Sequence, residues 1–223
     1  MGGINFRGGL GDDGLAPMDW HVWKNDFDFY LATDWVITET GSGTRAISQA
    51  KDGILLITNA AADDDVNQLQ LRDVASGQVA EHWKHTAAKR MFFEARFKVS
   101  DATQSDFVMG MQITDTSPLA VSDGIYFRKD DGDANIDCVV IKDSTATTVT
   151  AASTASDDTF MVLSWLYNGD GNFSFYKDAV LIGGAPTTNA PDDEELTVSF
   201  AIQNGEAVAK SMSLDYIMVA QER

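Results

Sequence analysis

The chain has 223 residues and carries 34 acidic against 16 basic side chains, a formal net charge of −18. This excess of acid argues against binding to nucleic acid or to anionic membranes, because both need a basic surface. A chain of this length can bury enough surface to fold as one large β domain, and its only cysteine, Cys138, allows no disulfide within the chain.

Residues 1–19 are predicted to form an extended N-terminal arm. The segment is rich in glycine, has neither strand nor helix periodicity, and lacks the basic and apolar regions of a secretory signal. It also contains Ile4, Phe6, Arg7 and Leu10, spaced apolar anchors with one base that a free tail would not need. We expect this arm to dock on a partner or a neighbouring subunit, with a disordered leader as the alternative.

Residues 20–223 are predicted to form a single β domain, which begins with a segment dense in aromatic residues. In Met91–Val99 the odd positions are apolar, while Glu94, Arg96 and Lys98 lie on the opposite face, as in a half-buried strand. The same reasoning predicts further strands at 53–58, 67–72, 107–114, 124–129, 135–141, 160–168, 173–178, 196–202 and 212–218.

Two glycine-containing turns separate pairs of these strands. Asn168–Gly171 and Asp130–Asp133 are tight-hairpin signals, because Asn, Asp and Gly tolerate positive φ. About a dozen strands at this spacing, with at most one helical turn at 81–88, predict an all-β fold, an antiparallel β-sandwich jelly roll. Cys138 and Trp165 lie within strand patterns and are expected in its core.

Three segments resemble a known superfamily. Lys89–Val99 and Phe107–Gln112 resemble the adjacent-strand signature of concanavalin A-like jelly rolls, and Ser213–Val219 resembles their final strand. That superfamily includes legume lectins, laminin-G modules and laminarinase-type glycoside hydrolases. The resemblance implies a concanavalin A-like sandwich.

Other segments are similar to jelly-roll virion proteins of tailed bacteriophages: Asn25–Tyr30, Trp35–Ile37 and Asp123–Asn135. Some of these proteins decorate or cement the capsid. The resemblance implies a non-enzymatic structural protein, made in the host cytoplasm and placed on the capsid exterior. It would bind the major capsid protein through the arm and one jelly-roll face, as a trimer or dimer, with Trp20 and Trp23 anchoring the arm to the body.

The residues give catalysis little support. Hydrolases of the superfamily carry two glutamates around an aspartate on one strand, so that both carboxylates share a face. This chain has no such motif, and Glu194 and Glu195 are adjacent, which in a strand would turn them to opposite faces. It also has no nucleophile elbow and no phosphate-binding loop. We expect no enzymatic activity and no cofactor.

One acidic segment has the spacing of the beginning of a calcium loop. Asp131, Asp133 and Asn135 follow it, but Ile136 replaces the glycine of position six and Lys142 the glutamate of position twelve. The segment is better explained as a turn with solvated acids, with calcium as the alternative. We expect no metal site.

Carbohydrate binding, to a surface glycan, is the alternative function. Lectin-like jelly rolls hold sugars with aromatic faces and with Asp and Asn side chains. The tryptophans of this chain include candidates, although core packing is the more common role: Trp20, Trp23, Trp35, Trp83 and Trp165. Trp83 stands between His82 and His85 in a polar segment and is expected to be the most exposed tryptophan. The two histidines lack the further ligands of a zinc site and are expected to be surface or packing residues.

Overall fold

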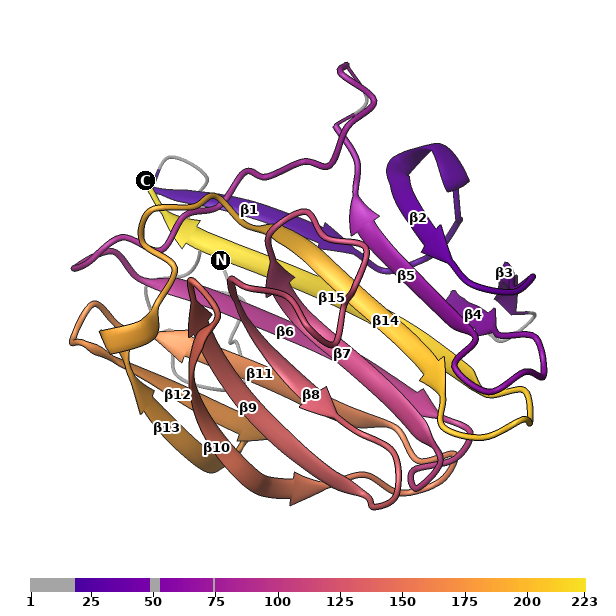
Figure 1. Cartoon of the computed structure of the whole chain (residues 1–223). Helices are drawn as coiled ribbons and strands as arrows, with labels where there is room; N and C mark the ends of the chain where they lie inside the picture. The colour runs from indigo at the N-terminus through magenta and orange to yellow at the C-terminus, as the bar shows by residue number, and fades with distance from the viewer. Residues whose placement is uncertain (1–18, 49–52, 74) are drawn as a thin grey trace, which may run out of the picture.

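The computed structural model describes residues 19–48, 53–73 and 75–223, which form two antiparallel sheets packed face to face (Figure 1). Sheet A has the order β13-β12-β11-β6-β15-β4-β3, and β1 pairs with β15 outside this path. Sheet B has the order β10-β9-β8-β7-β14-β5-β2. The strands are β1 (Trp20–Asn25), β2 (Trp35–Glu39), β3 (Thr44–Ser48), β4 (Ile54–Thr58), β5 (Val66–Leu71), β6 (Met91–Val99), β7 (Ser105–Gln112), β8 (Gly124–Lys129), β9 (Asn135–Lys142), β10 (Thr145–Thr154), β11 (Met161–Tyr167), β12 (Asn172–Lys177), β13 (Val180–Pro186), β14 (Thr197–Asn204) and β15 (Ser211–Glu222).

The core lies between the two sheets and follows from the alternation of the strands. The apolar positions of β6 and β7 point inward, and Phe97 of sheet A meets Phe107 of sheet B edge to face, with ring centroids 5.1 Å apart. Phe127 and Phe175 make a similar contact at 5.6 Å. Aromatic pairs of this kind add packing energy to the hydrophobic gain. The predicted antiparallel sandwich is confirmed.

The hairpin turns and the expected core residues are also confirmed. Residues 168–171 join β11 to β12, and residues 130–134 join β8 to β9. Cys138 and Trp165 are completely buried. The helical turn considered at 81–88 does not form, because Trp83 lies in an extended segment that bridges to Leu196.

Short 3₁₀ turns are the helical elements of the described residues: η1 (Ala32–Asp34) and η2 (Thr187–Asn189). Among the described residues no helix has the length and apolar character needed to cross a membrane.

Buried asparagines hold one end of the sandwich together. The amide nitrogen of Asn204 donates to the carbonyls of Ala60 and Ala62, at 2.7 and 2.8 Å, and its oxygen accepts from the backbone N–H of Lys210 and from Asn59. Asn204 is completely buried. Because buried backbone groups need partners, this side chain replaces strand pairing where the turns leave carbonyls unbonded.

The segment between β7 and β8, residues 113–123, covers the middle of the outer face of sheet B, crossing in front of β14 in Figure 1. Val121 packs there with Val108, Tyr126 and Ala201 in a second apolar cluster. Buried Gln112 fixes the segment by donating to the carbonyl of Pro118 at 2.9 Å. The outer face of sheet B is therefore partly filled by the chain itself.

Candidate functional site

A cleft of about 360 Å³ opens at one edge of the sandwich, where β1 of sheet A faces β2, the edge strand of sheet B. The strands that form it lie along the upper side of Figure 1. Its volume falls within the usual range of small-molecule sites. The residues that line it are Trp23, Asn25, Asp34, Trp35, Leu71, Arg72, Ala80 and His82.

Two tryptophans form the apolar wall of this tryptophan cleft. Trp23 of β1 pairs with Val219 of β15, a core residue, so its ring points toward the space between the sheets. Trp35 begins β2 and meets Trp23 edge to face, with centroids 5.9 Å apart. Trp35 is held from behind by Phe200 at 5.1 Å and is only 3% exposed, whereas Trp23 is half-buried.

Polar groups surround this wall. Arg72 follows β5, and its backbone N–H donates to the carbonyl of Asp34 at 2.9 Å, which fixes both residues at the cleft. The Nε of Arg72 is shielded from solvent and has no hydrogen-bond partner among the described residues. Asn25 uses its side-chain oxygen to accept from the N–H of Phe27. A shielded donor without a partner costs free energy in the folded state.

The expectation that Trp83 is exposed is wrong. Its ring is 1% exposed and stacks on His21, with centroids 5.2 Å apart and an interplanar angle of 11°. The bridge to Leu196 turns the ring inward, which its polar sequence neighbours concealed. His82 is exposed at the cleft, 6.4 Å from the ring of His21, and burial lowers the pKa of His21. Trp83 is therefore a core residue and does not itself line the cleft.

The two neighbouring histidines are not brought together as metal ligands. His85 is buried against the rings of Tyr167 and Phe173, at centroid distances of 4.7 and 5.5 Å, while His82 is exposed. Within 19–48, 53–73 and 75–223, no three His, Cys, Asp or Glu side chains are placed to hold a metal ion.

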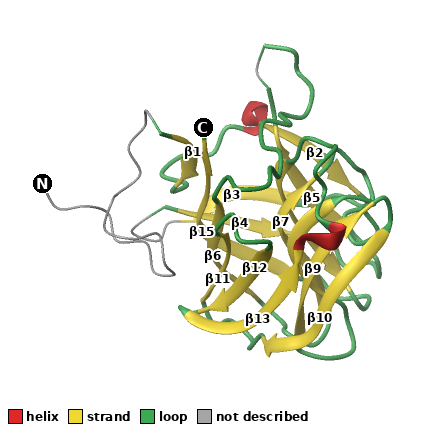
Figure 2. Cartoon of the chain, turned by 90° about the vertical axis from the view of Figure 1, so that its left-hand side faces the viewer, coloured by secondary structure: helices red, strands yellow, loops and turns green. Residues whose placement is uncertain are grey.

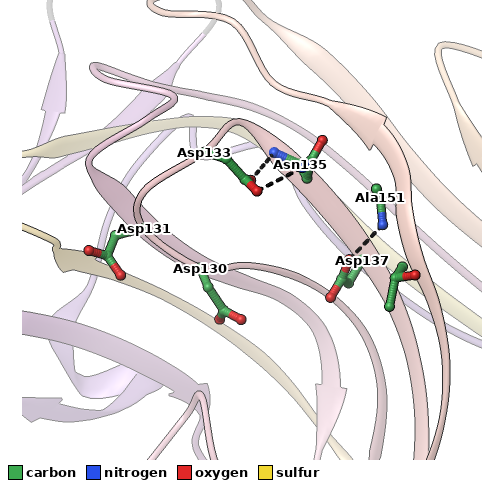
Figure 3. Close-up of a pocket in the computed structure, with 7 residues that line it drawn as sticks. Asp130, Asp131, Asp133, Asn135, Asp137 and Ala151 are labelled. Carbon is green, nitrogen blue, oxygen red and sulfur yellow. Dashed lines mark hydrogen bonds between the residues drawn. The ribbon is translucent and has the colours of Figure 1, made fainter.

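An acidic pocket of about 210 Å³ lies at the β8–β9 turn (Figure 3). Asp133 accepts from the backbone N–H and the side-chain nitrogen of Asn135, at 2.6 and 2.7 Å, which confirms that these residues build a turn. Asp137 accepts from the N–H of Ala151 at 2.8 Å. Arg128 lies 3.7 Å from Asp137 and neutralises part of the charge. The carboxylate of Asp133 therefore stabilises the turn, and that of Asp137 is used in a backbone hydrogen bond and an ion pair.

The residues expected to bind a partner are only partly described. Ile4, Phe6, Arg7 and Leu10 lie outside the described residues, and the capsid hypothesis that depends on them stays a prediction. Trp20 and Trp23 lie on opposite faces of β1: Trp20 packs on the outer face of sheet A, and Trp23 points into the cleft.

The same architecture occurs in solved structures. The chain matches a protein of unknown function from Shewanella oneidensis MR-1 with a TM-score of 0.61 and 17% identity, over 92% of this chain and 87% of that one. The carbohydrate recognition domain of Emp47p matches with a TM-score of 0.60 and 12% identity, over 94% and 99%. The fold is a concanavalin A-like, lectin-type β-sandwich.

An enzyme shares this fold as well. Endo-β-1,4-glucuronan lyase from the fungus Trichoderma reesei matches with a TM-score of 0.56 and 10% identity, over 88% of this chain and 94% of that one. No protein-family model and no curated protein matches the chain. At these identities the likeness shows the fold alone, and the function has to be argued from the site.

Sequence reasoning named both tryptophans of the cleft among its candidates but missed its polar residues. Asp34 and Arg72 meet only because β2 pairs with β5, which brings the residue before β2 beside the residue after β5. A signal was present in Arg72, a base at the end of a predicted strand in an acidic chain.

Proposed function

We propose that this protein is a non-catalytic carbohydrate-binding module that holds a sugar in the tryptophan cleft. The observation that carries the proposal is the combination of the half-buried ring of Trp23 with the polar residues Asp34, Arg72 and His82 in one cleft. A sugar ring offers both an apolar C–H face, which stacks on an indole, and hydroxyls that accept and donate hydrogen bonds.

The polar rim has the mixture of groups that hydroxyl recognition needs. The carboxylate of Asp34 accepts hydrogen bonds, the guanidinium of Arg72 donates them, and His82 can do either. Bonds to charged partners are stronger than bonds between neutral groups, so Asp34 and Arg72 would fix the orientation of the sugar while the tryptophans supply contact area.

The same cleft argues against hydrolysis at this site. Acid–base cleavage of a glycosidic bond uses two carboxyl groups about 5–10 Å apart. Asp34 is the one carboxylate among the described residues that line the cleft. We therefore infer binding rather than turnover.

A glycan array followed by titration of the best ligand tests the proposal. Trp23→Ala should reduce affinity by about tenfold or more, equivalent to about 1.4 kcal/mol of lost binding energy. Asp34→Asn, which keeps the shape of the side chain, should also weaken binding. Phe29→Ala is the matched control, because Phe29 is a 66% exposed aromatic that does not line the cleft.

Two results would contradict the proposal. One is an array without saturable binding to any glycan. The other is a ligand whose affinity is unchanged by Trp23→Ala and Asp34→Asn in variants that keep the circular dichroism of the parent. Release of reducing sugar from the bound glycan would contradict only the non-catalytic part.

A further inference from the structure

The outer face of sheet A carries an apolar row that the alternation of β6 does not predict. Phe92 and Phe93 are adjacent in β6: Phe93 belongs to the core between the sheets, so Phe92 points to the outer face. The strand register places Phe92 beside Ala220 of β15 and Leu166 of β11, and Ala220 beside Val22 of β1. Four neighbouring strands thus contribute one apolar residue each to a continuous row.

Three of the four residues of this row are shielded although they face away from the core; the fourth, Val22, is 40% exposed. Phe92 and Leu166 are 1% and 2% exposed, and Trp20 and Met218, which pack beside them, are 4% and 5% exposed. All members of the cluster belong to strands of sheet A itself. An outer sheet face is ordinarily polar and solvated, so large shielded side chains on it mark a contact surface.

Charged side chains occur further along the same face. Arg96 and Lys98, further along β6, form ion pairs with Asp215 and Asp158. The side chain of Arg96 is 38% exposed. The contact surface is therefore confined to the end of sheet A at which β1 pairs with β15. We call it the outer apolar patch, and its members are Trp20, Val22, Phe92, Leu166, Tyr176, Met218 and Ala220.

We propose that residues 1–18 pack on the outer apolar patch of their own chain. The chain enters the described structure at Asp19, whose carbonyl accepts the N–H of Arg223 at 2.8 Å, and the next residue, Trp20, is already part of the patch. Figure 2 shows β1 beside the C-terminus, so the segment starts at the edge of this face. The occupant is thus tethered directly beside its site.

Length and chemistry both fit. Eighteen extended residues reach up to about 60 Å. The seven strands in the main path of sheet A span about 29 Å at ~4.8 Å between neighbours, and β1 adds no width because it lies in line with β4 beside β15. Ile4, Phe6 and Leu10 provide the apolar groups that the patch can bury. The positive charge of Arg7 is complementary to the negative charge of Glu94, which lies on the outer face beside Met218.

Docking in cis gives the anchors a role that needs no second protein. The tether keeps the local concentration of the segment high, so modest contacts suffice to keep the patch covered. The second copy of the chain is the competing occupant, and it would make coverage depend on protein concentration.

Paramagnetic relaxation in the full-length chain tests the proposal. A nitroxide is attached at Gly8→Cys, and Cys138 stays unlabelled because it is completely buried. The backbone amide signals of Phe92 and Leu166 should lose most of their intensity relative to the reduced label. Those of Val139, on the outer face of sheet B, should keep theirs.

A mixed sample separates the two occupants. Isotope-labelled protein without nitroxide is combined with unlabelled protein that carries it, and the signals of Phe92 and Leu166 should then stay sharp. Broadening as strong in the mixed sample as in the single sample would overturn docking in cis, and so would the absence of broadening in both.

Variants of the segment provide the control. Phe6→Ser with Leu10→Ser should restore the intensities of Phe92 and Leu166, whereas Asp12→Ser with Asp13→Ser, which changes two polar positions, should leave the broadening in place. Equal effects of the two pairs would overturn the proposed role of the apolar anchors. The test does not depend on glycan binding, so its failure and the failure of the carbohydrate proposal are distinguishable.

Discussion

Replacing Asp106 with asparagine is expected to stabilise the fold at neutral pH. Asp106 lies in β7 and is only 4% exposed, and its Oδ1 has no hydrogen-bond partner among the described residues. Burial, reinforced by the nearby carboxylate of Asp131, raises the pKa of Asp106 from 3.8 to about 6. At pH 7 the carboxylate of Asp106 is therefore ionised while buried, and this costs the native state free energy that the solvated carboxylate does not cost the unfolded chain.

The size of the effect follows from linkage. One pKa unit corresponds to about 1.36 kcal/mol, so a rise of about two units costs up to ~3 kcal/mol of stability at pH 7. The raised pKa of Asp106 means that this cost is absent below pH 3.8, grows as the pH rises, and is complete above about pH 6. Asparagine has almost the same shape, bears no charge, and can still accept the N–H of Asp131.

Urea unfolding followed by tryptophan fluorescence at pH 5 and pH 7 measures this effect. Asp106→Asn should raise the free energy of unfolding by about 1–3 kcal/mol at pH 7, and by less at pH 5. Asp63→Asn is the matched control, because Asp63 is exposed and its replacement relieves the same general repulsion in a chain of net charge −18. A variant at Asp106 that is no more stable than Asp63→Asn at pH 7 would refute the reasoning.

Two further predictions concern buried polar side chains. Burial against Tyr167 and Phe173 lowers the pKa of His85. The neutral imidazole therefore fits the folded state above the unfolded pKa of about 6.5, and stability is lost as the pH falls from there through the lower pKa of the folded state. His85→Phe should therefore shift the acid unfolding midpoint, followed by circular dichroism, to lower pH; an unshifted midpoint contradicts this. Asn204→Ala should cost about 2–4 kcal/mol in urea unfolding, because it leaves several buried groups without partners. A loss below about 1 kcal/mol would show that water replaces the amide of Asn204.

The sandwich was predictable because the sequence of a half-buried strand shows which of its faces is buried. In β6 and β15 the alternation of apolar and polar side chains gives both the strand and the face that it buries. The strands that were missed lie at sheet edges, where alternation is weak. β10, with its many threonines, and β13, with two glycines, end their sheets and bury little.

The cleft could be predicted only as a set of candidate tryptophans. Trp23 and Trp35 are close in sequence, but their relation depends on β1 pairing with the last strand and β2 pairing with β5. Such pairings are set by the whole core and leave no local signal. Trp83 was expected to be exposed because its sequence neighbours are polar, but it is buried because its segment bridges to Leu196, which is distant in the sequence.

The strand β1 connects the two proposals and also keeps them separate. Among the described strands it pairs with β15, and each of its two faces carries a tryptophan. Trp23 on the inner face belongs to the tryptophan cleft, and Trp20 on the outer face belongs to the outer apolar patch, where Arg90 also stacks on its ring at 4.9 Å. Because consecutive side chains of a strand point to opposite faces, a substitution at Trp23 reaches the cleft without removing a contact of the patch. Loss of glycan binding in Trp23→Ala together with preserved broadening at Phe92 would show that the two faces act independently.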